Sequence, residues 1–261
     1  MEMVTSQNSK KVVVFGDLPI ATKVTMFLLH HKVQVYVVIG NKLPNNNDPW
    51  ENIPLLYDYC LSNDIVMLSL KDLAENFSEE FFSLGVSCRF SKILKKNIIG
   101  KFKNGILNLH GGILPEYGGM YSANHCILND ETEGGGTIHY IDENIDTGDI
   151  VKICRFRITK EDTSYTVFQK TQEALECGLE EIVLRAIESK IEGIQQSELI
   201  LQGHLKRYYD KHSLDGKKLI DYSKTDCLSI ERIIRAFDFP GYEPAYILDT
   251  KGNKVFLRYH Y

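Results

Sequence analysis

An amide and an imidazole stand two residues apart in the stretch ILNLHGGILPEYGGMYSANH, at Asn108 and His110. Side chains at positions i and i+2 of a β-strand project from the same face, so both groups are expected to lie together at the end of a buried strand. Such a pair is either a satisfied hydrogen-bonded pair of the core or a catalytic pair, and the first is the more common case. The glycines that follow would let backbone approach a ligand closely.

A carboxylate at Asp146, in the stretch DENIDTGDI, favours the catalytic interpretation. A carboxylate beside an imidazole fixes its tautomer and raises its basicity, while an amide and an imidazolium can face an oxyanion. No serine or cysteine adjoins His110, so the sequence does not indicate a covalent nucleophile. The pattern predicts that a substrate's own nucleophile attacks a carbonyl directly.

The elements that must position these groups alternate along the chain. Apolar runs predict strands at 11–16, 33–40, 65–70, 105–110, 137–142 and 149–158, and a strand that runs into a loop within 86–94. Helical periodicity predicts helices at 18–31, 55–64, 78–85, 95–102, 122–131, 164–191 and 229–238. Strand–helix–strand order predicts an α/β fold with a Rossmann-like, mostly parallel sheet flanked by helices. Composition changes near residue 195, which predicts a catalytic domain at 1–195 and a small α+β domain at 196–261, ending in a β-hairpin that turns at 251–253.

Missing motifs, net charge and composition argue against several classes of function. The first strand–helix turn, FGDLPIA, lacks the G-x-G-x-x-G fingerprint of dinucleotide binding. A net charge of −5 argues against a nucleic-acid partner. The six cysteines form no C-x-x-C pair, so no metal site is predicted. The longest apolar run is too short to span a bilayer and the first ten residues are polar, which predicts a cytoplasmic protein without membrane attachment.

The segment NLHGGILPEYGG, followed by IDTGDI, resembles the formyltransferase family that uses 10-formyltetrahydrofolate, whose motif is Asn-x-His, LLP-x-Y-x-G and an Asp-x-Gly loop. The resemblance covers about residues 11–195. The stretch RIIRAFDFPGYEPAY is similar to the small C-terminal domain of the nucleotide-sugar N-formyltransferases within that family. Many members have Ser at Gly112 and Arg at Gly118, and these departures concern the acceptor pocket.

The resemblance implies a role for each motif. Asn108, His110 and Asp146 match the catalytic triad: an amine attacks the formyl carbon, the first two stabilise the oxyanion, and Asp146 orients His110 and assists proton transfer. Backbone around the formyl donor is implied for Lys92, Ile93, Leu94, Ile141, Asp142, Glu143, Asn144 and Ile145, and acceptor contacts for Gly111, Gly112, Tyr117 and Tyr222.

The implied acceptor is the amine of a dTDP-linked amino-dideoxyhexose, with dTDP-3-amino-3,6-dideoxyglucose preferred to the 4-amino sugar. The alternatives are a methionyl-tRNA formyltransferase, a formyltetrahydrofolate deformylase and a non-catalytic sensor of folate or nucleotide sugar. Nearly balanced charge in 192–261 argues against tRNA. The apolar terminal hairpin, with its exposed edge, predicts a homodimer.

Overall fold

The computed structural model describes residues 10–40 and 47–259, and the chain forms two compact units. The first unit comprises the chain up to His110, Ile138–Lys152 and Glu176–Gln195. The second comprises Gly111–Thr137, Ile153–Leu175 and Gln196–Tyr261. The functional division at residue 195, with a catalytic domain before it, stays a prediction.

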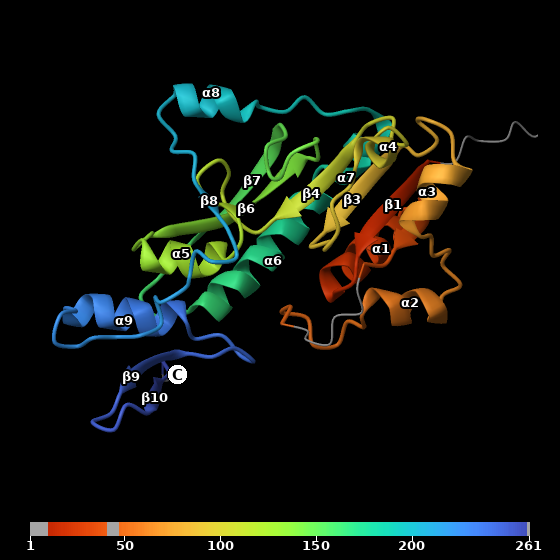
Figure 1. Ribbon diagram of the computed structural model, residues 1–261. Helices are drawn as coiled ribbons and strands as arrows, with labels where there is room; N and C mark the ends of the chain where they lie inside the picture. Colours follow the sequence, from red (N-terminus) through yellow and green to blue (C-terminus); the bar gives the residue numbers. More distant parts are fainter. Residues whose placement is uncertain (1–9, 41–46, 260–261) are drawn as a thin grey trace, which may run out of the picture. The chain divides into compact units, whose positions relative to one another are not determined.

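A six-stranded sheet has the order β2-β1-β3-β4-β6-β7. Its strands are β1 (Lys11–Gly16), β2 (Gln34–Val38), β3 (Leu84–Cys88), β4 (Ile106–His110), β6 (Glu133–Tyr140) and β7 (Ile150–Arg157). Strand β1 pairs in parallel with β2 and β3, and β3 pairs in parallel with β4. The arrows of β1, β3 and β4 run side by side in Figure 1. The predicted α/β fold with a mostly parallel sheet is confirmed. Because β1 and β3 lie inside the sheet, their near-continuous apolar runs are buried on both faces.

The helices of the first unit are α1 (Pro19–His30), α2 (Leu56–Ser62), α3 (Leu70–Asn76), α4 (Lys96–Ile99) and α7 (Val183–Glu188). One core cluster of this unit joins residues of β1 to the aromatic side chains Phe82 and Phe102, whose rings stack with centroids 5.5 Å apart. Helix α1 has a proline in its first turn, where the missing N–H costs no hydrogen bond.

Two predictions in this unit are wrong. The strand predicted at 65–70 is reduced to one bridge between Val37 and Met67, because Ser69 and Asp72 form a capping box that starts helix α3. The helix predicted at 78–85 is absent. Phe82 instead bridges to Phe102 and leads directly into β3, so burial of this aromatic side chain overrides the local helical pattern.

The second unit contains α5 (Ser122–Leu128), α8 (Gln196–Leu201) and α9 (Cys227–Ala236), with the short strands β5 (Gly118–Gly119) and β8 (Tyr208–Tyr209). Strands β9 (Ala245–Leu248) and β10 (Lys254–Leu257) pair antiparallel, which confirms the predicted terminal hairpin. Its turn is held by Asp249, whose Oδ1 accepts hydrogen bonds from the backbone N–H groups of Lys251 and Asn253.

The long helical pattern at 164–191 forms two helices, α6 (Ser164–Glu180) and α7, and not one. The break falls at Ile182, where φ is −118° and the N–H bonds to the carbonyl of Leu179, three residues back. A tight turn therefore interrupts the helix although the hydrophobic periodicity continues. Across residues 10–40 and 47–259, no helix combines the length and apolar character that a bilayer crossing requires.

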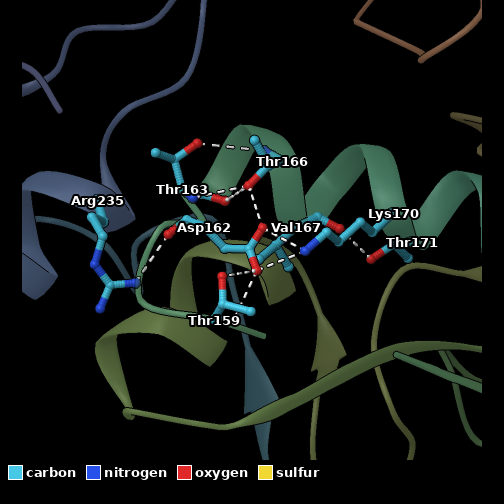
Figure 2. Close-up of polar contacts among 8 residues, drawn as sticks. All are labelled: Thr159, Asp162, Thr163, Thr166, Val167, Lys170, Thr171 and Arg235. Atoms are coloured by element: carbon cyan, nitrogen blue, oxygen red, sulfur yellow. Dashed lines mark hydrogen bonds and ion pairs between the residues drawn. The ribbon is translucent and has the colours of Figure 1, made fainter. Parts of the chain in front are cut away.

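A polar cluster in the second unit fixes the start of α6 (Figure 2). The carboxylate of Asp162 accepts hydrogen bonds from Lys170 Nζ at 2.7 Å, from the Thr159 N–H at 2.8 Å and from Thr166 Oγ1 at 2.9 Å. Arg235 Nη1 of α9 donates to the main-chain carbonyl of Asp162 at 2.9 Å. The cluster ties the beginning of α6 to α9 through buried, hydrogen-bonded charges.

Candidate active site

Strand β4 brings Asn108 and His110 to the carboxyl end of the parallel strands, on one face, as the i, i+2 spacing predicts. His110 is buried, with 7% of its surface exposed. The neighbouring strand β6 adds a group that the sequence analysis left without a role. Asn108 Nδ2 lies 3.1 Å from Nε2 of His139, whose side chain is 2% exposed.

The two ring nitrogens of His139 have different partners, and these assign its tautomer. Nδ1 lies 2.8 Å from the carbonyl oxygen of Tyr140, which can only accept a hydrogen bond, so the proton is on Nδ1. Nε2 is then an acceptor, and the Asn108 amide must turn its NH₂ group toward it. His139 thereby fixes which way round the Asn108 amide stands, and leaves the second N–H of that amide for another acceptor.

His139 is neutral at physiological pH. Burial and, to a smaller extent, the neighbouring His110 lower its pKa, the carboxylate of Asp146 acts in the opposite direction, and the net value is about 4. A neutral His139 keeps Nε2 available as a hydrogen-bond acceptor at the neutral and higher pH values at which an amine is nucleophilic.

The carboxylate of Asp146 faces both imidazoles from the loop between β6 and β7. Its Oδ1 lies 3.4 Å from His110 Nδ1 and 3.7 Å from His139 Nε2. A carboxylate on the Nδ1 side of His110 leaves Nε2 of that ring as the nitrogen that can exchange a proton with a substrate. The first unit therefore brings together the three catalytic residues predicted from sequence, and their roles stay proposals.

The loop that carries Asp146 is shaped by its own hydrogen bonds. Asp146 itself has φ +55°, a conformation that non-glycine residues rarely adopt. Asp142 Oδ1 accepts from the Asn144 N–H at 3.0 Å and from Thr147 Oγ1 at 2.8 Å, which closes the loop. Gly148 packs so closely on the Tyr140 carbonyl that a Cβ would overlap it, so glycine is required there. These constraints aim the Asp146 carboxylate at the imidazoles.

The residues predicted around the formyl donor lie in two loops of the same unit. In the first, Lys92 and Ile93 are exposed, whereas Leu94 is 4% exposed and belongs to the core cluster, so its contribution to a ligand would be through backbone. In the second, Ile141 packs against the same cluster, Glu143 pairs with Lys96 at 3.3 Å, and Ile145 is half exposed.

The residues predicted to contact the acceptor belong to the second unit. A Cβ on Gly111 would meet nothing within 4 Å, whereas one on Gly112 would lie 2.5 Å from the Tyr117 carbonyl and 2.7 Å from Ser122 Oγ. Glycine is thus necessary at 112 in this chain, where Ser122 already occupies the space. Tyr117 is buried, with its hydroxyl 2.5 Å from Glu131 Oε1, and Tyr222 is 67% exposed.

No pattern in the sequence predicts His139 as a member of this site. Its position in TIHYI carries no motif on its own, and only the pairing of β4 beside β6 shows that it meets Asn108. Within residues 10–40 and 47–259, no group of three or more His, Cys, Asp or Glu side chains has an arrangement that could hold a metal ion. The arrangement of Asn108, His110 and Asp146 offers proton transfer and oxyanion stabilisation.

A family model described as Formyl transferase matches residues 10–183, about two thirds of the chain. The chain belongs to the formyl transferase family. It is therefore a formyltransferase enzyme, and the matched segment contains Asn108, His110, His139 and Asp146.

Three similar proteins illustrate the range of this family. GDP-perosamine N-formyltransferase of Brucella melitensis is 30% identical over 188 residues, which cover 69% of each protein. Methionyl-tRNA formyltransferase of Methylacidiphilum infernorum is 32% identical over 155 residues, covering 59% of this chain and 46% of that protein. The crystal structure of the Helicobacter canadensis N-formyltransferase, in complex with folinic acid and dTDP-3-aminofucose, matches with a TM-score of 0.76 and 26% identity, covering 93% of this formyltransferase and 85% of that chain.

Proposed function

We propose that this formyltransferase moves a formyl group from 10-formyltetrahydrofolate to the amine of a nucleotide-linked amino sugar. The observation that carries the proposal is the cluster of Asn108, His110 and Asp146 at the end of β4, with His139 setting the direction of the Asn108 amide. Neither a metal nor a covalent enzyme intermediate is needed for the attack of an amine on an activated formyl group.

The proposed reaction has two steps, addition of the amine and collapse of the tetrahedral intermediate. The substrate amine attacks the formyl carbon, a C–N bond forms, and the carbonyl π electrons become an oxyanion. The proton lost by the amine passes to Nε2 of His110, whose Nδ1–H faces Asp146, and the resulting imidazolium and the second Asn108 N–H donate hydrogen bonds to the oxyanion. Collapse of the intermediate then breaks the bond to N10, which takes the proton back from His110 Nε2, so that N-formyl sugar and tetrahydrofolate leave.

The preferred acceptor is a dTDP-linked amino-dideoxyhexose, and dTDP-3-amino-3,6-dideoxyglucose is the first choice. The similarity to the Helicobacter canadensis enzyme, whose complex contains dTDP-3-aminofucose, supports both the nucleotide and the 3-amino position. The 4-amino sugar and a GDP-linked sugar are the next candidates, the latter because of the Brucella melitensis relative.

Methionyl-tRNA formylation is the second candidate function, favoured by the Methylacidiphilum infernorum relative, although this chain spans less than half of that protein. Against it stands the charge of 192–261, where Lys and Arg barely outnumber Asp and Glu. Binding to tRNA rests on phosphate neutralisation, and a balanced surface supplies little of it. A deformylase and a non-catalytic sensor remain as outcomes of the assay below.

The binding residues complete the proposal. We assign donor contacts to the loops at 92–94 and 141–145, and acceptor contacts to Gly111, Gly112, Tyr117 and Tyr222. The exposed ring of Tyr222 suits stacking on a nucleotide base, whereas the buried hydroxyl of Tyr117 suits a supporting role. Residues 1–195 would then carry the chemistry and 196–261 would supply substrate contacts and dimerisation, in a cytoplasmic protein.

Dimerisation is assigned to the terminal hairpin. Leu248, Val255 and Phe256 are 43%, 44% and 52% exposed, which leaves an apolar surface on β9 and β10. Light scattering after gel filtration should give a dimer mass, and Phe256→Glu should give the monomer mass because a buried carboxylate at such an interface is costly. A monomer mass for the unaltered chain at all concentrations would contradict the assignment.

Mass spectrometry can test the function directly. Each reaction contains the protein, 10-formyltetrahydrofolate and one acceptor. The acceptors are the dTDP-3-amino, dTDP-4-amino, UDP-4-amino and GDP-4-amino dideoxyhexoses, and Met-tRNA. A single formyl addition to one sugar confirms the reaction and identifies the acceptor. Formylation of Met-tRNA alone, or release of formate without any acceptor, would replace the proposal by the transferase for tRNA or by the deformylase. Folate binding without any product would favour the sensor.

A further inference from the structure

A buried ion pair lies beside the carboxyl ends of β1 and β3 in the first unit. The side chain of Asp48 has no exposed surface, and its Oδ1 accepts from Arg89 Nη1 at 2.8 Å. Its Oδ2 accepts from the N–H of Ile20, in the first turn of α1, at 3.0 Å. A carboxylate of the chain itself therefore occupies the positive end of α1, where dinucleotide-binding folds place a pyrophosphate.

Arg89 is the first residue after β3, and it has φ +53°. A left-handed conformation at a long side chain is unfavourable and persists only where the surroundings enforce it. The ion pair to Asp48 enforces it, because the side chain of Arg89 is two-thirds buried and the carboxylate fixes its direction. The reversal at Arg89 decides where the chain goes next, into the loop at 90–94.

The first residues of loop 90–94 are closely packed. The ring of Phe90 lies edge-on to Phe15 of β1, with centroids 5.5 Å apart. A Cβ on Gly40, just beyond β2, would lie 3.1 Å from both the Phe90 ring and Ser91 Oγ. Loop 90–94 thus stands against the ends of three strands while its tip, with Ile93 69% exposed, projects outward.

The ion pair has no evident advantage for stability. Burial raises the pKa of the Asp48 carboxyl, and Arg89 with the Ile20 N–H oppose that change. Replacing a buried ion pair by neutral side chains often leaves stability unchanged or improves it, because desolvation offsets the attraction. What the pair supplies is a fixed direction for Arg89 and for the chain that follows.

We infer that Asp48 and Arg89 are positioning residues, which hold the backbone of 90–94 in the conformation that receives the pteridine of the formyl donor. The inference rests on the proposed function for the identity of the ligand. It extends the donor site to Asp48, which carries no sequence motif and would act on the ligand through Arg89 and the segment that Arg89 orients.

The double variant Asp48→Asn/Arg89→Met tests this without leaving an unpaired buried charge, since the new amide oxygen can still accept from the Ile20 N–H. Lys101→Met is the matched control: Lys101 pairs with Glu79 at 3.1 Å, is also largely buried, and lies at the opposite end of β3. Arg89→Lys serves as the conservative variant, because lysine restores the charge without the planar geometry.

Two measurements on the full chain separate the inference from the proposed function. Hydrogen–deuterium exchange without ligand should show amides of 90–94 exchanging about tenfold faster or more in the double variant, and unchanged in Lys101→Met. Calorimetry should show the Kd for folinic acid rising about tenfold or more, with the Kd for dTDP within about twofold, and a smaller rise for Arg89→Lys.

Each outcome has one meaning. Unchanged exchange, or faster exchange with an unchanged Kd for folinic acid, would overturn the inference while leaving the proposed function intact. Failure of the unaltered protein to bind folinic acid would overturn the proposed function and the pteridine assignment together, and the exchange measurement would still decide whether the ion pair orders the loop.

Discussion

Asp146 and Asp162 are two largely buried aspartates in different units of this formyltransferase, and their surroundings differ. Asp162 has its carboxylate within 2.7–2.9 Å of Lys170, Thr159 and Thr166 (Figure 2). Asp146 Oδ1 lies 3.4 Å and 3.7 Å from the nitrogens of His110 and His139, on a residue with φ +55°. The first carboxylate is enclosed by an ammonium group and two threonines at hydrogen-bonding distance, and the second faces two titratable rings.

The difference matches a structural role for Asp162 and the catalytic role proposed for Asp146. Burial alone would raise the pKa of Asp162, but hydrogen bonds from Lys170, Thr159 and Thr166 outweigh it and lower that pKa, so the group stays charged and fixed. Asp146 is held by an unusual backbone conformation at a distance that can shorten when substrate binds. Burial of a charge therefore does not by itself mark a catalytic residue; the distance and identity of its partners do.

Asp146→Asn should have the largest effect on activity. The amide keeps the size of the side chain but removes the charge that stabilises a protonated His110, so kcat should fall about a hundredfold or more. The midpoint of thermal unfolding should stay close to that of the unaltered protein. Steady-state kinetics and calorimetry on the same preparation check both. A kcat within a few-fold of the unaltered enzyme would remove Asp146 from the catalytic group.

Asp162→Asn should have the opposite profile. Loss of the charge leaves Lys170 without its partner and places an NH₂ group against donors, so the free energy of unfolding at pH 7 should fall by about 2–3 kcal/mol. Activity of the folded fraction should change little. The measurement is urea unfolding, with Lys170→Met as a partner variant whose cost is smaller because that side chain is 37% exposed.

The pH dependence of this difference follows from the lowered pKa of Asp162. A carboxyl whose pKa is lower in the folded than in the unfolded state stabilises the fold above its unfolded pKa of about 3.9, and this contribution is lost as pH falls through the folded value. The difference in the free energy of unfolding between Asp162→Asn and the unaltered protein should therefore be largest at pH 5–7 and should decrease below about pH 4. An equally large gap at pH 3 would contradict the charge-based explanation.

Long, strongly patterned elements of the fold could be predicted from sequence. Strand β1, helix α1 and the terminal hairpin each combine apolar periodicity with a local start or stop signal, such as the proline of α1 or the Gly252 turn. The failures fall where a local signal competes with tertiary burial. Ser69 and Asp72 start a helix where apolar residues suggest a strand, and Phe82 enters the sheet where periodicity suggests a helix.

The candidate site could be predicted only as far as one strand or one loop carries it. Asn108 and His110 share a face of β4, and period two places them together without knowledge of the rest. His139 and the Asp48–Arg89 pair depend on which strands become neighbours and which loop reaches α1, and these are long-range contacts with no local pattern. The residues that the sequence did not predict, His139, Asp48 and Arg89, are those to which we assign a positioning role.

His139→Met should have a smaller effect on activity than Asp146→Asn, and it refines the comparison of the two aspartates. Methionine fills the space but provides no acceptor at Nε2, so the Asn108 amide loses its fixed direction and kcat should fall about tenfold, less than for a residue that contacts the oxyanion. His139→Gln, whose Oε1 can accept from Asn108, should recover part of that loss. Equal losses for both variants would mean that His139 acts through packing alone.

His139→Met should also change how the free energy of unfolding depends on pH. The pKa of His139 is about 4 in the folded protein, below its unfolded value of about 6.5, so the unfolded chain binds more protons between these values and stability rises with pH across that range. The unaltered protein should lose on the order of 2 kcal/mol from this residue as pH falls from 6.5 to 4.5, and His139→Met should lack that part of the slope. Urea unfolding of both proteins at pH 4.5, 5.5 and 7 measures it. Nε2 of His139 can accept a hydrogen bond only while the imidazole is neutral. Identical slopes would show that folding does not lower the pKa of His139, so the ring would be protonated below about pH 6.5 and the Asn108 amide would then have to turn its oxygen toward it.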